Sequence, residues 1–512
     1  MRQIGTDDKN PPKPDVVVQF GEGNFLRAFA DYMIDVANEK GVFCGGVAVV
    51  KPISSGGLEK YERQGAAYTV ILRGKEGGRN TAEHRIISCI NRVVDPFADY
   101  AAYLDIARGE DLRFAVSNTT EAGIVFDADD SFEAKPAASF PGKLVQLLFE
   151  RYGHFAGDVS KGLIMLPAEL IESNGAKLRE CVMKLVKLWG LPEGFAAWID
   201  ESCIFADCLV DRIVSGYPAE EAESIERDML GYRDELMVVG EPFGLWVVAS
   251  DRHAEIAALF PLDKAGMQVV FTDDLRPYRE RKVRLLNGAH TASVLAAYIM
   301  GLDTVGDAMA NPTVRAFVEK VVYDEISPTV PLPAREVRAF ADSVLERFEN
   351  PYLRHNLLSI SLNSVSKWKA RILPSLKDSL AATGVLPPCI CFSMAALAAF
   401  YRSGERGEFC LVGRRAGEAY SVKDDAFVLD FFATNYALPN AEYVRSLLAN
   451  TAFWGEDLTQ IAGFADAVTF GLDDIAEHGM ADAVRRVVSK LGLAEGYHER
   501  GKDICDKGAF DT

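Results

Sequence analysis

The sequence predicts an α/β amino-terminal domain built on a parallel sheet, followed by a mainly α-helical carboxyl-terminal domain. Three observations support this fold class. Between residues 15 and 208, short apolar runs alternate with helical stretches, as expected of a parallel sheet covered by helices. From about residue 279 onward, helical stretches follow one another without a return of strand alternation. The length of 512 residues, at about 150 residues per domain, leaves room for more than one domain.

The expected strands are short apolar runs, several of which end in polar or glycine-rich turns. They lie at residues 16–20, 46–50, 85–90, 114–116 and 163–166. Two further runs, at residues 245–249 and 269–271, are candidates for the same sheet. Ligands of an open α/β sheet bind outside the carboxyl ends of its strands, so these turns are the first places to look for chemistry.

The expected helices of the second domain lie at residues 283–300, 312–326, 334–348, 378–382, 394–401 and 426–435. Prolines and glycines separate these segments, and Pro387 and Pro388 are placed where they would end a helix. We therefore expect a polar extension at residues 1–14, an α/β domain at 15–270 and a mostly helical domain at 271–512. We expect the polar tail at residues 495–512 to be loosely held.

Composition and charge exclude several classes of protein. Hydrophobic residues make up 49% of the chain and charged residues 25%, which is typical of a globular protein. The 55 Lys and Arg residues against 74 Asp and Glu residues give a net charge of -19, which repels phosphate backbones and anionic membranes. We therefore expect neither nucleic acid nor a membrane as a partner.

Cysteine usage indicates the compartment. Nine cysteines are scattered along the chain without a Cys-x-x-Cys pair and without the spacing of a zinc site, which fits a reduced, intracellular environment. Residues 1–14 are polar, unlike a signal peptide, and no run of about 18 apolar residues occurs later. We therefore expect a cytoplasmic protein.

A glycine turn follows the first expected strand. Residues 16–29 are typical of a buried strand, a Gly-x-Gly turn at Gly21 and Gly23, and the start of a helix. Gly21 permits a tight turn, Gly23 lets the backbone approach a pyrophosphate, and the amides of the helix start point at the anion. The third glycine of the dinucleotide fingerprint would fall at Leu26, so a plain tight turn is the alternative.

Two cations lie near the expected carboxyl ends of the first two strands. Arg27 either binds a phosphate of the cofactor or is a solvated surface residue. An acidic residue after the second strand would favour NAD, but the sequence has Lys51 there. Lys51 either meets the 2′-phosphate of NADP or faces water, so these residues alone leave NAD and NADP open.

A second polar group opens the helical region. In a single helix of about 100° per residue, Lys282, His290 and Asn287 project at roughly 0°, 80° and 140°, on one broad face. A partly desolvated lysine exchanges protons with a hydroxyl, Asn287 donates and accepts hydrogen bonds, and His290 orients the substrate or the lysine. The alternative is an ordinary basic helix start, because three arginines flank Lys282. Gly288, inside the helix, indicates a close approach by another group.

Polar loops follow two other expected strands. Asn118 and Thr119 come after the run at residues 114–116, and Asn174 comes after the run at 163–166. Both loops lie where ligands of the sheet would bind. The alternatives are helix caps for Asn118 and Thr119 and an ordinary Asn-Gly turn for Asn174.

Together these motifs resemble the long-chain mannitol dehydrogenase family of polyol oxidoreductases. The motifs are residues 20–28 (FGEGNFLRA), 117–123 (SNTTEAG) and 209–213 (LVDRI), together with the spacing of Lys282, Asn287 and His290. The sequence is most similar to the tagaturonate reductase branch, also called altronate oxidoreductase, over about residues 15–490. The resemblance implies a Rossmann-type dinucleotide-binding domain, a helical substrate domain, an active site in the cleft between them, and no metal.

The resemblance also implies roles for individual residues. It implies Lys282 as general acid and base, Asn174 and Asn287 as hydrogen-bond partners of the reacting oxygen, and His290 as the family's histidine. His355 and Lys367, in a family-like segment, are candidates for binding a substrate carboxylate, with a capping histidine and a solvated lysine as the alternatives. The candidate cofactor-binding residues are Phe20, Gly21, Gly23, Asn24, Phe25, Arg27, Lys51, Asn118 and Thr119.

The activity implied by the resemblance is reversible, metal-independent reduction of D-tagaturonate to D-altronate by NADH, in hexuronate catabolism. The expected partners are NAD, with NADP not excluded, and a small hexuronate or aldonate, while the oligomeric state stays open. Alternatives within the family are a fructuronate reductase and a mannitol 2-dehydrogenase. A non-catalytic nucleotide-binding sensor is the alternative from a different class.

Overall fold

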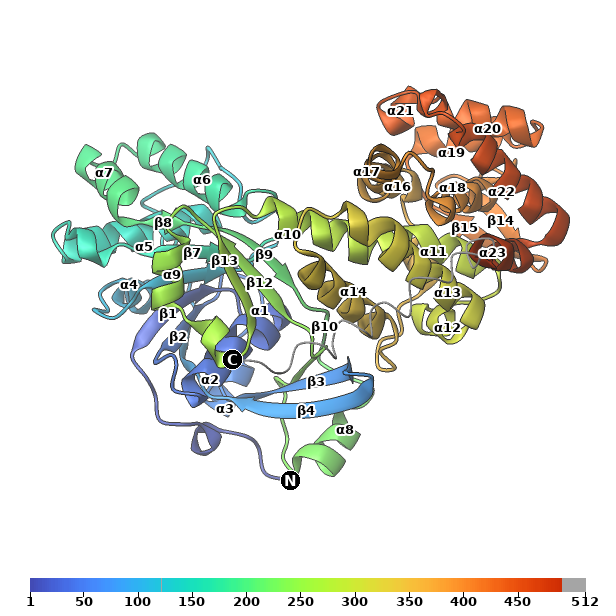
Figure 1. The fold of residues 1–512 in the computed structure, drawn as a ribbon. Helices are drawn as coiled ribbons and strands as arrows, with labels where there is room; N and C mark the ends of the chain where they lie inside the picture. The colour runs from blue at the N-terminus through green and yellow to red at the C-terminus, as the bar shows by residue number, and fades with distance from the viewer. Residues whose placement is uncertain (121, 490–512) are drawn as a thin grey trace, which may run out of the picture. The chain divides into compact units, whose positions relative to one another are not determined.

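A computed structural model describes residues 1–120 and 122–489 (Figure 1). The chain divides into two compact units, Met1–Tyr278 and Arg279–Thr512, called here the first and the second unit. The predicted polar tail at residues 495–512 lies outside the described residues, as does Glu121. None of the helices in the described part of the chain is long and apolar enough to cross a membrane.

The first unit is built on a six-stranded parallel sheet with the strand order β5-β2-β1-β6-β7-β8. The strands are β1 (Asp15–Phe20), β2 (Gly46–Val50), β5 (Ile90–Val94), β6 (Phe114–Ser117), β7 (Ile164–Pro167) and β8 (Ile204–Phe205). The strand order reverses between β1 and β6, which makes the carboxyl ends of these two strands the switch point where ligands of such sheets bind. The predicted parallel sheet is confirmed.

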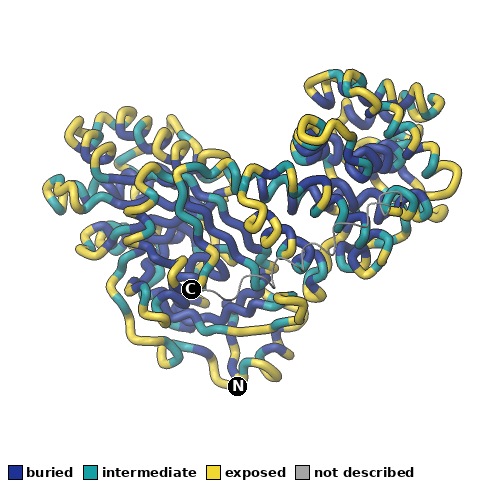
Figure 2. The backbone as a smooth tube through the Cα atoms, viewed as in Figure 1, coloured by how far each residue is buried: buried dark blue, intermediate teal, exposed yellow. Residues whose placement is uncertain are grey.

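The inner strands β1, β2, β6 and β7 are mostly buried, which explains why they read as continuous apolar runs (Figure 2). Val17 packs into a core on one face together with α2 (Tyr32–Glu39). Val18 packs into the core of the other face, which α4, α5, α6 and α7 cover. These four helices are α4 (Tyr100–Ala107), α5 (Phe140–His154), α6 (Asn174–Leu188) and α7 (Glu193–Ser202).

Two smaller sheets complete the first unit. One has the order β10-β11-β3-β4, from Val214–Gly216, Val238–Gly240, Tyr68–Glu76 and Arg79–Ile87. The other has the order β13-β12-β9, from Gln268–Thr272, Leu245–Ala249 and Asp207–Asp211. The short helices of this unit are α1 (Asn24–Leu26), α3 (Glu59–Gln64), α8 (Ala222–Ile225) and α9 (His253–Leu259), and α10 (Arg276–Arg281) runs across the boundary.

Two strand predictions for this unit are wrong. The run at residues 85–90 is not one strand, because β4 ends at Ile87 in one sheet and β5 begins at Ile90 in another. The runs at 245–249 and 269–271 form strands, but in the three-stranded sheet rather than the parallel one. Apolar periodicity reports that a strand is buried and does not report which sheet it joins.

The second unit is mostly helical, as predicted. Its helices are α11 (Gly288–Ile299), α12 (Val305–Ala310), α13 (Pro312–Lys320), α14 (Ala334–Phe348), α15 (Leu357–Ile360), α16 (Ser364–Arg371), α17 (Leu373–Thr383), α18 (Pro388–Tyr401), α19 (Ala426–Asn435), α20 (Asn440–Leu448), α21 (Thr451–Trp454), α22 (Phe464–His478) and α23 (Met480–Ser489). The buried helix α11 packs against α13, α15, α16 and α18. Gly288 permits part of this packing, because a Cβ there would lie 3.3 Å from the Arg371 carbonyl oxygen.

Two sequence expectations for the second unit need correction. A hairpin of β14 (Leu411–Arg415) and β15 (Glu418–Val422) interrupts the helices, so strand structure does return. Pro388 begins α18 rather than ending a helix, because its missing N–H and fixed φ suit the first helical position.

Candidate functional site

The glycine turn lies at the switch point of the parallel sheet. Gly21 follows β1 with a φ of +127°, a backbone conformation open to glycine, and its N–H donates to the Val50 carbonyl at 3.0 Å. A Cβ on Gly21 would lie 3.2 Å from the Asn118 carbonyl oxygen, whereas the space in front of Gly23 is open. Gly23 precedes α1, so the first amides of the helix face this open space. The turn thus has the shape of an anion cradle.

Two aromatic side chains of the motif have structural contacts. The Phe20 ring lies in the core, 5.0 Å from the Phe140 ring, and its carbonyl accepts the Asn118 N–H at 3.2 Å. Phe25 stacks on Phe29 at 4.9 Å. Phe20 and Phe25 therefore shape the turn mainly through packing.

The loop after β6 is held by a buried carboxylate. Glu169, from the segment after β7, accepts hydrogen bonds from the N–H and the hydroxyl of Thr119, both at 2.9 Å, and from the Ser117 hydroxyl at 3.0 Å. The Asn118 amide donates to the Ala168 carbonyl at 3.1 Å. Burial raises the pKa of Glu169 although these hydrogen bonds oppose the shift. Asn118 and Thr119 are therefore fixed beside the glycine turn, and sequence reasoning did not single out Glu169 as the residue that fixes them.

A cavity of about 540 Å³ opens beside this loop. Its walls come from the segments after β2 and β6 and from the start of α5, and they combine apolar side chains with hydroxyls. The lining residues are Pro52, Ile53, Thr119, Thr120, Ala122, Gly123, Val125, Phe126, Asp127, Ala128, Ala138, Ser139 and Phe140. A cavity of this kind, next to a glycine turn, suits the flat apolar base and the hydroxyls of a nucleoside.

Arg27 is buried, so its reading as a solvated residue is wrong. Its guanidinium donates to the Leu236 carbonyl and to the side-chain oxygen of Asn24, and it lies 5.4 Å from the Tyr68 ring centroid. These contacts use two nitrogens of the guanidinium, whereas its buried Nε has no hydrogen-bond partner among the described residues. The contacts favour a structural role for Arg27 beneath the turn, and its predicted contact with a phosphate stays a prediction.

A buried polar network lies on the protein side of the glycine turn. The Gln19 amide donates to the Gly21 carbonyl at 3.1 Å and lies 3.4 Å from an Asp31 carboxylate oxygen, which also accepts the Tyr68 hydroxyl at 2.8 Å. Burial raises the pKa of Asp31 to about 7. The hydrogen bond from Gln19 thus fixes the Gly21 carbonyl so that it points into the protein interior.

Lys51 is also buried, with 3% of its surface exposed. Its ammonium lies 2.8 Å from an Asp95 carboxylate oxygen and 3.3 Å from the Ser54 carbonyl oxygen. Lys51 follows β2 and Asp95 follows β5, and these strands are neighbours in the sheet. Lys51 therefore forms an ion pair and does not face water, and its predicted contact with the cofactor stays a prediction.

Asn174, at the start of α6, has a fully occupied side chain. Its amide nitrogen lies within 3.0 Å of the carbonyl oxygens of Pro167, Glu169 and Cys208, and its oxygen accepts the N–H of Cys208 at 2.8 Å and of Gly175 at 2.9 Å. An amide has two donor hydrogens and two acceptor sites, so none is left for a substrate oxygen in this arrangement. The observed bonds favour a positioning role, and the expected contact with the reacting oxygen stays a prediction.

The polar residues of the second unit begin on a π turn. Residues Lys282–Asn287 form a π-helical segment that leads into α11. Such a turn is closed by hydrogen bonds between residues five apart, so Asn287 lies nearly above Lys282 rather than 140° away as a plain α-helix predicts. Lys282 is partly buried, and so is Asn287, whose backbone carbonyl accepts the Thr291 hydroxyl at 2.9 Å.

His290 lies in an aromatic and cationic setting. Its ring stacks on Phe348 at 4.1 Å and meets the His355 ring edge-on at 5.3 Å. Its Nδ1 is buried and has no hydrogen-bond partner among the described residues. Burial, reinforced by His355, Arg347, Arg371 and Lys367, holds the pKa of His290 well below its ordinary value, so the ring is neutral at physiological pH.

Lys367 and Arg371 supply positive charge beside His290. Both come from α16, one turn apart: the Lys367 ammonium donates to the Ile360 carbonyl at 2.9 Å, and the Arg371 guanidinium donates to the Thr291 hydroxyl at 3.3 Å. Burial lowers the pKa of each of them. The structure thus brings the predicted residues His290, His355 and Lys367 together. Sequence reasoning missed Arg371, which spacing on α16 could have found.

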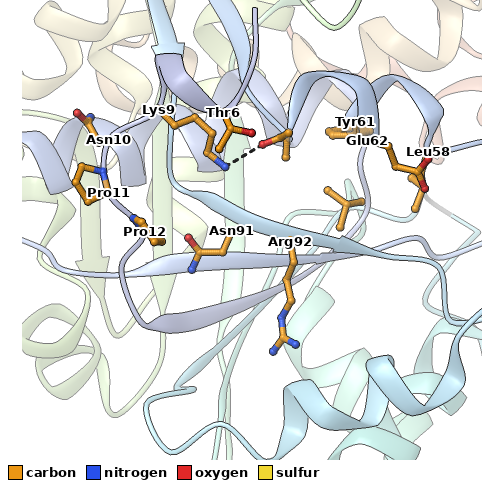
Figure 3. A pocket seen from close by; sticks show the side chains of 13 residues that line it. Thr6, Lys9, Asn10, Pro11, Pro12, Leu58, Tyr61, Glu62, Asn91 and Arg92 are labelled. Atoms are coloured by element: carbon orange, nitrogen blue, oxygen red, sulfur yellow. Dashed lines mark hydrogen bonds between the residues drawn. The ribbon is translucent and has the colours of Figure 1, made fainter.

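A further cavity, of about 550 Å³, lies beneath the amino-terminal extension (Figure 3). Its two cations are already engaged, since Lys9 donates to the carbonyls of Gly65 and Ile90 and Arg92 pairs with Asp15 and Asp105. Tyr61, on its wall, donates to the Glu22 carbonyl at 2.8 Å and so supports the glycine turn from behind. The contacts of this cavity indicate a structural role.

Residues 1–120 and 122–489 contain no group of three or more His, Cys, Asp or Glu side chains placed to hold a metal ion. The expectation that the reaction needs no metal stays a prediction.

The sequence matches two family models. The model described as mannitol dehydrogenase Rossmann domain matches residues 15–258, and the model described as mannitol dehydrogenase C-terminal domain matches residues 274–476. Relatives named altronate oxidoreductase, from Shigella flexneri and from Klebsiella pneumoniae (strain 342), are each 44% identical over 479 residues. Each alignment covers 92% of this chain and 96% of the relative.

Solved structures share the fold. A Pseudomonas fluorescens mannitol 2-dehydrogenase, in a ternary complex with NAD and D-mannitol, is 20% identical with a TM-score of 0.62, covering 95% of this chain and 100% of that one. A D-sorbitol dehydrogenase in substrate-free form is also 20% identical, with a TM-score of 0.73, covering 94% of this chain and 100% of that one. At this identity the likeness supports the architecture alone.

Proposed function

Because the chain belongs to the mannitol dehydrogenase family, we propose that it is an NAD-dependent altronate oxidoreductase, which interconverts D-tagaturonate and D-altronate. Membership of this family makes the chain a dehydrogenase of polyols or sugar acids. The assignment to altronate is supported by relatives named altronate oxidoreductase, at 44% identity over 92% of the chain.

The observation that carries the choice of substrate is the cationic setting of His290. Tagaturonate and altronate each carry a carboxylate, whereas mannitol and sorbitol are uncharged. Lys367 and Arg371 are half-buried beside a neutral His290. Burial of these two cations costs free energy, which for Lys367 outweighs the attraction of Asp424. A bound carboxylate offsets that cost through charge-assisted hydrogen bonds.

The glycine turn fits NAD. Gly21 takes a backbone conformation that other residues rarely adopt, and the open space in front of Gly23 leaves room for a pyrophosphate against the first amides of α1. NADH, when bound, supplies the hydride that reduces the keto carbon of D-tagaturonate beside its terminal hydroxymethyl group. The other steps belong to side chains of the protein.

Lys282 gives a proton to the oxygen of that carbon as the carbonyl becomes an alcohol, and it takes the proton back in the reverse direction. Asn287 lies one π turn away and donates a hydrogen bond to the same oxygen while negative charge develops on it. The neutral His290 ring orients a substrate hydroxyl through the nitrogen that lacks a partner among the described residues. Asn174 acts at a distance, by hydrogen bonds that fix the end of β7 and the start of β9.

A panel of substrates tests the assignment. D-Tagaturonate, D-fructuronate and D-fructose are compared for reduction with NADH and with NADPH. We expect the highest kcat/KM for D-tagaturonate with NADH. A higher kcat/KM for D-fructuronate or D-fructose would replace the proposed substrate, and tight NADH binding without turnover of any of them would favour the non-catalytic sensor.

The carboxylate contact has its own test. Replacing Arg371 or Lys367 with Met should raise the KM for D-tagaturonate by about 10- to 100-fold, because a hydrogen bond to a charged group contributes about 1.5–3 kcal/mol. The KM for NADH should change little. Lys369→Met is the matched control, since Lys369 lies on the same helix but is exposed. Unchanged KM values in both variants would dismiss these residues as the carboxylate clamp.

A further inference from the structure

The ion pair between Lys51 and Asp95 bears on cofactor choice, a question that rests on the proposed use of a nicotinamide dinucleotide. NADP differs from NAD by a phosphate on the 2′-oxygen of the adenosine ribose. In dinucleotide-binding sheets, residues near the end of the second strand contact this 2′-position. A carboxylate there binds the free hydroxyl of NAD, and a cation binds the phosphate of NADP. In this chain the residue at the end of β2 is a lysine, which by charge alone favours NADP.

The surroundings of Lys51 cancel that preference. Its ammonium is almost wholly buried and bonded to Asp95 and to the Ser54 carbonyl, both on the protein. Asp95 is held in place by the Phe97 N–H, which donates to its other carboxylate oxygen at 2.9 Å. Although burial opposes it, these hydrogen bonds and Lys51 lower the pKa of Asp95, so the carboxylate is charged at neutral pH.

A second carboxylate adds to the negative charge. Glu22, the middle residue of the glycine turn, is half-buried and interacts electrostatically with both Lys51 and Asp95. The carboxylates of Glu22 and Asp95 therefore both interact with the buried Lys51 ammonium, at the carboxyl ends of β1, β2 and β5. A phosphate placed there would meet repulsion from Asp95 and no available charge on Lys51.

We infer that Asp95, by neutralising Lys51 and opposing a 2′-phosphate, makes this site select NAD over NADP. Asp95 is thus a specificity-determining residue that acts mainly through Lys51. The Asp95 carboxylate, which follows the neighbouring strand β5, thus excludes a 2′-phosphate as an acidic residue at the end of β2 does in other NAD-binding sites. The side chain of Lys51 is flexible enough to turn toward a phosphate once the carboxylate is gone.

The experiment measures dissociation constants of NADH and NADPH by fluorescence titration for wild type, Asp95→Asn, Asp95→Ser, Lys51→Met and the double variant Lys51→Met/Asp95→Asn. We expect Asp95→Asn to tighten NADPH binding at least tenfold relative to NADH. The double variant should lose that gain, because the gain depends on the charge of Lys51. Asp105→Asn is the matched control, since it breaks an exposed ion pair with Arg92 in the same unit.

Two outcomes overturn the inference. One is an unchanged ratio of the two dissociation constants in both folded Asp95 variants, and the other is a gain that persists in the double variant. Asp95→Ser keeps the test decisive if Asp95→Asn does not fold. Failure of the wild type to bind either cofactor would instead reject the proposed function, so the two failures are distinguishable.

Discussion

At the scale of single residues, the proposed chemistry depends most on Lys282. Replacing it with Ala should lower kcat for D-tagaturonate reduction by about 10²- to 10⁴-fold, the usual contribution of general acid–base catalysis. NADH binding should stay nearly intact, because the glycine turn belongs to the first unit and Lys282 to the second. Steady-state kinetics and NADH titration measure the two effects.

The control for this variant is Lys264→Ala, which removes an exposed lysine elsewhere in the chain. Primary amines added to Lys282→Ala should restore part of the lost turnover, since they can carry the missing proton. Near-normal turnover of Lys282→Ala would remove it from the proton transfer.

A second residue-scale prediction concerns the stability of the fold. Asp31 has a pKa of about 7 in the folded protein against an ordinary value of 3.8, so between these values the folded state keeps a proton that the unfolded state has released. The free energy of unfolding should therefore fall as the pH rises through this window, by at most about 1.4 kcal/mol per pH unit, and level off above pH 7.

Urea unfolding of wild type and Asp31→Asn at pH 5, 6, 7 and 8 measures this slope. The amide of Asn cannot ionise, so the variant should lose the contribution of Asp31. Asp200→Asn, at an exposed ion pair, is the control and should keep it. Identical slopes for wild type and Asp31→Asn would show that Asp31 does not titrate in this range.

Residue identity alone was a poor guide to role at three positions. Arg27 and Lys51 are cations near the glycine turn, but Arg27 donates to Leu236 and Asn24, and Lys51 forms an ion pair with Asp95. Asn174 has the amide expected of a substrate contact, but backbone groups occupy all of its hydrogen-bonding sites. In each case the role depends on neighbours that are distant in the sequence.

At the scale of elements, the glycine turn should be the part of the first unit least tolerant of change. Gly21→Ala places a Cβ 3.2 Å from the Asn118 carbonyl oxygen and forces alanine to a φ of +127°, which costs on the order of 1–3 kcal/mol. We expect at least a tenfold weaker affinity for NADH, measured by titration. Gly153→Ala is the control, because Gly153 lies in α5 with open space where its Cβ would be. Equal affinities in the two variants would contradict the assigned role of the turn.

The π turn is the second element whose geometry matters. Residues Lys282–Asn287 close their turns over five residues, and this changes which side chains lie above one another. π turns within α-helices occur often at functional sites, which agrees with the placement of Lys282 and Asn287 at its two ends. Apolar periodicity cannot reveal such a turn, because a single wide turn leaves the rest of the pattern intact.

At the scale of the whole molecule, the proposed site residues are divided between the two units. The cofactor candidates and Asn174 belong to Met1–Tyr278, and Lys282, Asn287, His290, His355 and Lys367 belong to Arg279–Thr512. NADH should therefore slow amide hydrogen exchange at residues 21–27 and 117–120 of the first unit. D-Altronate added with NADH, a pair that cannot react, should slow exchange around residues 287–291 and 364–371. Protection by NADH confined to the second unit would contradict this division of roles.

The sequence determined the family, the class of enzyme and the fold class. The predicted parallel sheet, the mainly helical second unit and membership of the mannitol dehydrogenase family are confirmed. Local patterns suffice for these because burial on two faces gives strands their apolar runs, and because the glycine turn and the Lys282 spacing are short motifs.

The tertiary structure alone decided which charges are free to act and which side chains meet. Only the folded chain pairs Lys51 with Asp95, brings Arg371 from α16 beside His290 on α11, and saturates the Asn174 amide with the backbone of β7 and β9. The physical reason is that a side chain's charge, hydration and hydrogen bonds are set by groups in contact with it. Those groups lie far along the chain, where no local pattern of residues records them.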